Sequence, residues 1–216
     1  MKKAKPNILV FASGDKDGGG SGFLEMVEFT RTLPAVLDAR IVGVVSNHEW
    51  GGVRKKADKL GVEFLHWEGP FDAHNYQRLV AEFKADYVML SGWLKLVCGL
   101  DPARTVNIHP GPLPDFGGPG HYVHEAVMKA FREGKIIQSA VTMHFVDEQY
   151  DRGPIIYQFP ILIREDDTPE TLAARVNEKE RALQSVYLNK VVHGYIYYHE
   201  GKVFSRDHEP KLNYFR

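Results

Sequence analysis

Short apolar runs alternate with helix-like segments along roughly the first ninety residues, and this alternation limits the possible folds more than any other feature. The segments predicted as strand, helix, strand, helix, strand, helix and strand are residues 7–12, 23–33, 39–46, 53–60, 62–65, 72–84 and 87–90. Apolar runs of this length between amphipathic segments are typical of buried parallel strands joined by crossover helices. The pattern therefore predicts a parallel sheet with helices on both faces.

The pattern changes after residue 100. The strand, helix, strand and strand expected next are residues 105–109, 120–131, 139–146 and 155–162, the last two joined by a turn. A long helix follows from Pro169 to about Tyr198, with Thr168 as its N-cap and Pro169 at its first position. We therefore expect an α/β fold with a mostly parallel, Rossmann-like twisted sheet and an antiparallel edge from the C-terminal half.

Charge and cysteine content exclude several classes of protein. The chain has 27 Lys and Arg against 28 Asp and Glu, so it lacks the basic excess of a nucleic-acid binder. Its longest apolar runs hold five or six residues, far short of the ~20 that cross a bilayer. The single cysteine, Cys98, excludes a disulfide framework and a multi-cysteine zinc site, and its apolar surroundings favour a core position. We expect a cytoplasmic protein that binds neither nucleic acid nor membrane.

A glycine-rich loop at residues 13–22 follows the first predicted strand. Backbone N–H groups of such a loop, beside a helix N-terminus, favour an anion, and open α/β sheets bind phosphates at this position. Lys16 supports anion binding, whereas Asp15 and Asp17 oppose it unless they point away. The loop matches neither a P-loop nor a dinucleotide fingerprint. A flexible surface loop without a ligand is the alternative.

Two polar side chains share one face of the strand predicted at residues 105–109. Alternation places Asn107 and His109 on that face, at the carboxyl end where α/β sheets hold their active sites. An amide donor beside an imidazole suits a developing oxyanion, and the alternative is that both residues merely cap the strand. Asp151 lies in a turn bounded by Gly and Pro, and it is a candidate only if it meets His109, whose pKa a carboxylate would raise.

An acid interrupts the apolar stripe of the long C-terminal helix. The stripe consists of Leu172, Ala173, Val176, Leu183, Tyr187 and Val191. At about 3.6 residues per turn, Glu180 falls inside this arc and Asn177 lies at its edge. Burying a carboxylate is unfavourable unless it has a partner. Glu180 therefore either reaches a bound ligand or pairs with a neighbouring Arg or Lys.

A metal site is a rival interpretation. His121 and His124 lie on one face of a predicted helix, and with His109 and Asp151 they could ligate a metal such as zinc. The spacing is unspecific, and no His-Glu-x-x-His motif occurs. We therefore expect no metal.

Several motifs, in this order, are similar to those of the folate-dependent formyltransferases. From Asn107 to His121 the chain reads Asn-Ile-His-Pro, then Leu-Pro, a glycine-rich turn and Gly-His. Ser-Gly-Trp-Leu-Lys-Leu-Val at residues 91–97 is similar to the family's folate-binding segment, and Gln-Tyr-Asp-Arg-Gly-Pro at residues 149–154 to its catalytic aspartate turn. The resemblance covers nearly the whole chain. Any one motif alone would be weak, but together, in this order and at these spacings, the motifs are specific.

The resemblance implies roles in catalysis and folate binding. Asn107, His109 and Asp151 match the catalytic residues of the family, in which Asp151 would keep the imidazolium form of His109 populated. The segment whose backbone would hold the pterin ring is Leu94, Lys95, Leu96 and Val97. Asn107 would also contact the folate.

The resemblance also implies where the acceptor substrate binds. Gly20, Ser21 and Gly22 match the stretch that holds a ribonucleotide phosphate, and Glu180 matches a ribose-binding glutamate, with Asn177 beside it.

Some positions depart from the family pattern. The glycine-rich loop is several residues longer than the usual Ser-Gly-x-Gly-Ser-Asn, and Gly22 stands in place of its asparagine. Asn177 stands where a glutamine is usual, and His74 lies near the position of an arginine that often contacts folate. The Leu113-Pro114 bond matches a cis peptide of the family.

The resemblance implies formyl transfer from 10-formyltetrahydrofolate, a co-substrate, to an amine, without a metal. The branch closest in its motifs acts on glycinamide ribonucleotide in purine biosynthesis. The alternatives are a formyltransferase for a sugar-nucleotide amine, a formyltetrahydrofolate hydrolase, a metal-dependent hydrolase and a non-catalytic nucleotide-binding module.

We expect one formyltransferase domain over residues 1–216. Its Rossmann-like, nucleotide-binding half would be residues 1–100, and its catalytic and folate-binding half residues 101–216. The expected partners are the small-molecule substrates, and the protein would be a monomer or a homodimer.

Overall fold

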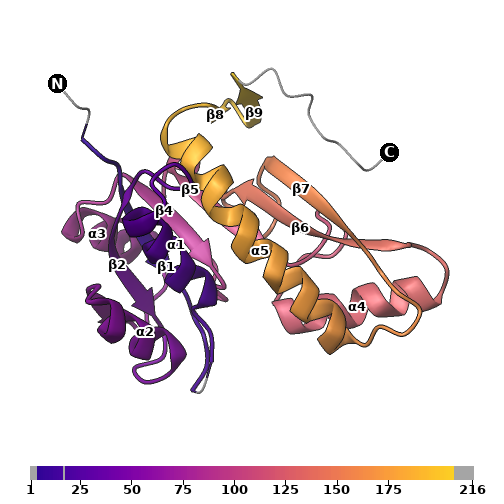
Figure 1. Cartoon of the computed structure of the whole chain (residues 1–216). Coiled ribbons are helices and arrows are strands. Elements are labelled where there is room, and N and C mark those ends of the chain that lie inside the picture. The colour runs from indigo at the N-terminus through magenta and orange to yellow at the C-terminus, as the bar shows by residue number, and fades with distance from the viewer. Residues whose placement is uncertain (1–3, 17, 207–216) are drawn as a thin grey trace.

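A seven-stranded sheet forms the centre of the computed structural model, which describes residues 4–16 and 18–206 (Figure 1). The strands are β1 (Asn7–Phe11), β2 (Arg40–Ser46), β3 (Phe64–His66), β4 (Tyr87–Ser91), β5 (Thr105–His109), β6 (Gln138–Phe145) and β7 (Ile155–Leu162). Their order across the sheet is β3-β2-β1-β4-β5-β6-β7. The first five strands are parallel to one another, β6 pairs antiparallel with β5, and β7 pairs antiparallel with β6. The predicted parallel sheet with an antiparallel C-terminal edge is confirmed.

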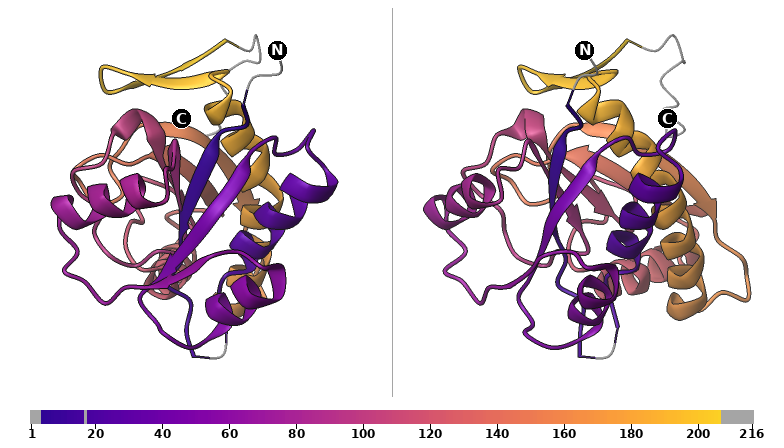
Figure 2. Two further views of the ribbon diagram at one scale, coloured as in Figure 1. Left: turned by 90° about the vertical axis from the view of Figure 1, so that its left-hand side faces the viewer. Right: turned by 60° about the vertical axis from the view of Figure 1, so that its left-hand side comes forward.

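Helices cover the two faces of this sheet unequally. They are α1 (Ser21–Thr32), α2 (Gly52–Leu60), α3 (Ala73–Glu82), α4 (Gly120–Arg132) and α5 (Pro169–Val192), with a short 3-10 helix, η1 (Pro102–Arg104), before β5. Side chains of α1, α2, α4 and α5 join one large core cluster, whereas α3 packs in a second cluster on the opposite face (Figure 2).

The two clusters explain why the strands near the centre are apolar throughout. Along β1, Ile8 and Val10 belong to the first cluster, and Leu9 and Phe11 to the second. Successive side chains of a strand point to opposite faces, so a sheet covered on both sides buries every residue.

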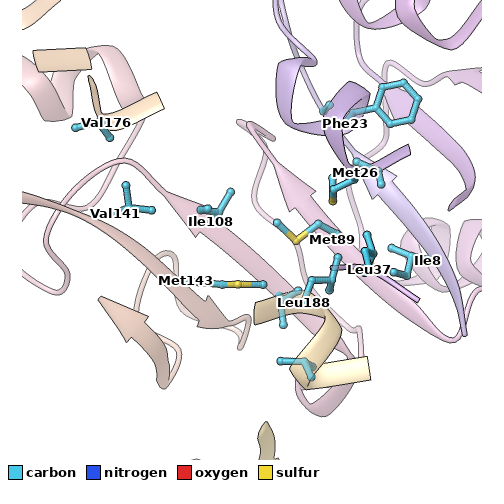
Figure 3. Close-up of a cluster of buried hydrophobic side chains, with 14 of the residues drawn as sticks. Ile8, Phe23, Met26, Leu37, Met89, Ile108, Val141, Met143, Val176 and Leu188 are labelled. Carbon is cyan, nitrogen blue, oxygen red and sulfur yellow. The ribbon is translucent and has the colours of Figure 1, made fainter. Parts of the chain in front are cut away.

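Figure 3 shows the first cluster between the sheet and its helices. Phe23 and Met26 of α1 and Leu188 of α5 gather there with Ile8 and Met89 of the sheet. This contact positions α1 and α5 beside the carboxyl ends of the central strands, where the candidate site lies.

The long helix α5 begins as predicted. Thr168 is the N-cap, its side chain accepts a hydrogen bond from the Thr171 N–H, and Pro169 occupies the first turn. The Thr171 side chain bonds back to the Thr168 N–H and closes a capping box. These bonds satisfy backbone donors that a helix start otherwise leaves unpaired.

The end of α5 was predicted wrongly. The helix ends at Val192 rather than near Tyr198 because Gly194 adopts a left-handed φ of 73°. This conformation lets backbone N–H groups after the helix bond to carbonyls of its last turn. The chain then forms a hairpin of β8 (Ile196–His199) and β9 (Lys202–Ser205), which the sequence analysis did not predict.

The remaining predicted elements are present, with ends shifted by at most two residues. Cys98 is partly buried against the second cluster rather than enclosed within it. Within residues 4–16 and 18–206, no helix combines the length and apolar character that crossing a membrane requires.

Candidate active site

A pocket opens at the carboxyl ends of β1, β4 and β5. β1 and β4 are neighbours in the sheet, although β2 and β3 lie between them in the sequence. The order of the strands reverses here, and such reversal points in α/β sheets form crevices. The glycine-rich loop, the segment after β4, the end of β5, the turn at Asp151 and one face of α5 line the pocket.

Asn107, His109 and Asp151 converge at this pocket. The His109 Nδ1 atom lies 3.5 Å from Asp151 Oδ2, and Asn107 Nδ2 lies 3.4 Å from Asp151 Oδ1. Asp151 reaches the end of β5 from the turn between β6 and β7, where its backbone adopts a φ of 53°. The Gly118 N–H donates to Asp151 Oδ2 at 2.8 Å and holds the carboxylate in place.

His144 of β6 belongs to the same cluster, and the sequence analysis missed it. The β5–β6 register places it opposite Asn107. Its Nδ1 lies 2.8 Å from the Phe145 carbonyl, which assigns the ring proton to Nδ1. In the neutral ring Nε2 can accept a hydrogen bond from Asn107 Nδ2 at 3.1 Å, and in the protonated ring it faces Asp151 Oδ1, which lies 3.6 Å away. The available signal was a histidine near the end of a predicted strand, but a sequence pattern does not specify which residue lies opposite it.

Both ring nitrogens of His109 face acceptors. Nε2 lies 2.7 Å from the Phe116 carbonyl, Nδ1 faces Asp151, and the residue is 3% exposed. Burial lowers the pKa of His109, and Asp151 and the Phe116 carbonyl offset this only in part. The pKa therefore lies below its ordinary value. Asp151 acts in the expected direction on His109, because its carboxylate favours the imidazolium form, but desolvation outweighs it in the unliganded site.

Asp151 is the anionic member of the cluster. Burial acts to raise its pKa, but the His144 side chain, the charge of His109 and the Gly118 N–H together lower it below the ordinary value. The carboxylate is therefore ionised at neutral pH and available as a hydrogen-bond acceptor.

A second, narrower pocket adjoins the first. Asn107 and Asp151 line both pockets, so the polar cluster stands where the two meet. Of the segment that the resemblance assigns to folate binding, Lys95, Leu96 and Val97 line the second pocket and Leu94 lines the first.

Hydrogen bonds from the protein interior fix the backbone of this segment. The Tyr76 hydroxyl donates to the Leu96 carbonyl at 3.0 Å and accepts a hydrogen bond from Trp93 Nε1 at 3.0 Å. The Leu94 N–H donates to Ser13 Oγ at 3.0 Å. The segment is therefore a preformed wall of the second pocket.

The glycine-rich loop places the start of α1 at the first pocket. Gly20 is the N-cap with a φ of 71°, no side chain caps the helix, and Ser21 and Gly22 form its first turn in the pocket wall. Uncapped N–H groups and the helix dipole favour an anion there. Lys56 of α2 braces the loop, because its Nζ donates to the Gly19 carbonyl at 2.8 Å.

The acidic residues of this loop were expected to oppose an anion. The Asp15 carboxylate accepts a hydrogen bond from the Gly18 N–H, so it is engaged within the loop. Asp17 lies outside the described residues.

Glu180 and Asn177 line the same pocket from α5. Asn177 Nδ2 lies 3.4 Å from Glu180 Oε2. Burial raises the pKa of Glu180 to about 7, and in the described part of the chain no cation acts to lower it. Of the two interpretations left open by the sequence, this environment favours contact with a ligand over a salt bridge.

His124, part of the rival metal interpretation, is buried close to His109. Burial and the charge of His109 lower its pKa to about 4. The side chain of His121 lies outside the described residues. Among the side chains that are described, no group of three or more His, Cys, Asp or Glu is arranged to hold a metal ion.

Comparison with known families matches residues 7–188 to the formyl transferase family. The phosphoribosylglycinamide formyltransferase of Bacillus subtilis (strain 168) is 31% identical over 191 residues, covering 83% of this chain and 89% of that protein. The chloroplastic phosphoribosylglycinamide formyltransferase of Arabidopsis thaliana is 34% identical over 193 residues, covering 83% of this chain. The chain spans 63% of the Arabidopsis protein and 58% of a chloroplastic relative from Vigna unguiculata.

Solved structures agree with this relationship. Glycinamide ribonucleotide transformylase 1 from Symbiobacterium toebii superimposes with a TM-score of 0.81 at 27% identity, covering 94% of this chain and 95% of that chain.

Proposed function

The chain belongs to the formyl transferase family, and from this premise we propose that it transfers a formyl group from 10-formyltetrahydrofolate to the amine of glycinamide ribonucleotide, a step of purine biosynthesis. The relatives in Bacillus subtilis and Symbiobacterium toebii are named for this acceptor. The observation that carries the proposal is the pair of pockets that meet at Asn107 and Asp151. A reaction that joins two substrates needs their reacting atoms at one such junction.

Each pocket suits one of the two substrates. The second pocket is lined by Lys95 and the apolar Leu96 and Val97, and with a volume of about 30 Å³ it would have to widen to admit a flat pterin ring that pairs with main-chain groups. The first pocket combines the uncapped start of α1 with Glu180, which suits a phosphate and a ribose hydroxyl respectively. The acceptor amine would then lie between the two, beside Asp151.

The reaction moves one proton and one formyl group. The acceptor nitrogen attacks the formyl carbon, the carbonyl oxygen becomes an oxyanion, and the carbon–nitrogen bond to the folate then breaks. The folate nitrogen gains a proton and the attacking amine loses one. In this scheme ionised Asp151 accepts the amine proton, and Asn107 and His109 donate hydrogen bonds to the oxyanion.

The Phe116 carbonyl oxygen lies 2.7 Å from His109 Nε2 and takes up the hydrogen bond that Nε2 could donate. The oxyanion would replace this carbonyl as the acceptor, so the loop that carries Phe116 has to yield when the reaction begins. Protonation of His109 is favoured at that moment, because the new negative charge raises a pKa that burial alone lowers.

An assay of formyl folate consumption tests the proposal. The purified protein is given 10-formyltetrahydrofolate with glycinamide ribonucleotide, with a sugar-nucleotide amine, or with no acceptor, and His109→Ala serves as the inactive control. We expect turnover with glycinamide ribonucleotide alone. Release of formate at the same rate without an acceptor would identify a hydrolase, and turnover only with the sugar nucleotide would assign a different acceptor.

A further inference from the structure

Gln184 of α5 is a buried amide in the wall of the first pocket, and half of its hydrogen-bonding capacity is unused. The residue is 1% exposed and lines the pocket with Glu180 and Asn177. Ser91 Oγ donates to Gln184 Oε1 at 3.1 Å, whereas the Nε2 atom has no hydrogen-bond partner among the described residues. An unpaired buried donor is rare and destabilising, so its presence in a pocket wall calls for a ligand that accepts from it.

Gly22 at the first turn of α1 leaves the space that this amide occupies. A Cβ atom at position 22 would lie 2.5 Å from Gln184 Nε2 and 2.5 Å from Ser91 Oγ. Neither distance is tolerated by real side chains, so any larger residue at position 22 displaces the amide. Gly22, Ser91 and Gln184 therefore form one structural unit.

We propose that Gln184 is a substrate-binding residue that determines specificity for a phosphorylated acceptor, with Nε2 donating to an oxygen of its ribose phosphate end. This inference rests on the proposed function and names a residue that the resemblance did not assign. Ser91 holds the Oε1 end of the amide, which leaves Nε2 as the end free to bind. The uncapped start of α1, whose Gly22 lies close to this amide, attracts an anionic group.

The neighbouring side chains on α5 complement this role. Glu180 lies one helical turn before Gln184 and offers oxygen acceptors, whereas Gln184 offers a donor. A ribose phosphate has hydroxyl donors at one end and acceptor oxygens at the other. On this helix face Glu180 can therefore accept from the ribose hydroxyls while Gln184 donates to the phosphate oxygens.

Two substitutions of Gln184 test the inference. Gln184→Leu removes the donor, and Gln184→Glu keeps the shape but brings a carboxylate to the anion site. Isothermal titration with glycinamide ribonucleotide and with ribose 5-phosphate gives the Kd values, and steady-state assays give KM for both substrates. We expect Gln184→Leu to raise both Kd values about tenfold or more, and Gln184→Glu to raise them further. The KM for 10-formyltetrahydrofolate stays within about twofold.

A matched control and a rescue separate binding from folding. Gln77→Leu changes a glutamine of α3 that bonds to the Gly99 carbonyl outside the first pocket, and it leaves both Kd values unchanged. Gly22→Asn by itself weakens binding because the new side chain meets Gln184. In a Gln184→Ala background the same Gly22→Asn change fills the vacated space with an amide, and we expect it to recover part of the lost affinity.

The outcomes distinguish this inference from the proposed function. If wild-type protein formylates glycinamide ribonucleotide and both Gln184 variants keep the wild-type Kd, the inference is wrong and the proposed function stands. If Gln184→Leu weakens both substrates equally and lowers Tm, Gln184 is only structural and the inference is wrong. If wild-type protein neither binds nor formylates glycinamide ribonucleotide, both are wrong.

Discussion

Replacing Glu180 by glutamine should stabilise the protein at alkaline pH while weakening binding of the acceptor. Burial raises the pKa of Glu180 from 4.5 to about 7. Such a rise corresponds to about 3 kcal/mol of unfavourable ionisation. Because the side chain is only partly buried at the pocket wall, water screens it, and we expect about 1–2 kcal/mol.

The sign of this effect depends on pH. Between pH 4.5 and 7 the folded state holds a proton on Glu180 that the unfolded state has lost, so the contribution of Glu180 to stability falls as pH rises through this window. Above pH 7 the full penalty applies. Glutamine has no charge to desolvate, so the advantage of the variant over wild type grows as pH rises from 4.5 to about 7 and stays at its full value above that.

Thermal unfolding at pH 5 and pH 8 measures the gain. At about 2–4 °C per kcal/mol for a chain of this size, Tm of Glu180→Gln should exceed that of wild type by about 2–8 °C at pH 8, with a smaller difference at pH 5. Glu178→Gln, an exposed position on the same helix, is the control. A difference between Glu180→Gln and wild type that is equal at both pH values would refute the reasoning.

Further predictions concern the polar cluster and its turn. Asn107→Ala and His109→Ala should each lower kcat about 10²–10³-fold with an unchanged Tm, as expected for lost oxyanion donors; near-wild-type kcat in either variant would contradict the proposed mechanism. His144→Ala should lower kcat and leave the KM for the acceptor nearly unchanged, because His144 positions Asn107 and Asp151 and lines only the second of the two pockets; steady-state kinetics separates these parameters, and a rise in the acceptor KM with unchanged kcat would argue against positioning. Gly153→Ala should destabilise the protein by about 2–3 kcal/mol, because a Cβ there would lie 1.8 Å from the Phe145 carbonyl oxygen; denaturant unfolding measures the loss, and an unchanged midpoint would show that the turn can shift.

Periodicity located the elements of the fold well where local pattern and burial coincide. The run from Ile8 to Phe11 is apolar on both faces because both faces are covered, and such runs are easy to recognise. The end of α5 was missed because the apolar stripe continues past Val192, and one left-handed glycine, Gly194, ends the helix. Apolar spacing alone does not separate such a helix from the short strand that follows it.

The candidate site was predictable only where its chemistry lies in one local pattern. Alternation along β5 brought Asn107 and His109 to one face, but whether Asp151 meets them depends on how a distant turn closes. His144 and Gln184 could not be recognised, because the role of His144 depends on strand register and that of Gln184 on a contact between α5 and the end of β4. The pKa of His109 likewise depends on three-dimensional burial, which outweighs the carboxylate that sequence reasoning emphasised.

One continuous helix, α5, carries the side chains Asn177, Glu180 and Gln184 on consecutive turns, and Val176 and Leu188 anchor it in the core. At about 1.5 Å of rise per residue, the outer two of these side chains start about 10 Å apart along a rigid axis. The helix therefore works as a fixed measure of ligand length. Substitution on this face can retune which acceptor fits while the reacting end stays untouched, whereas inserting one residue ahead of Asn177 would rotate all three away by about 100°.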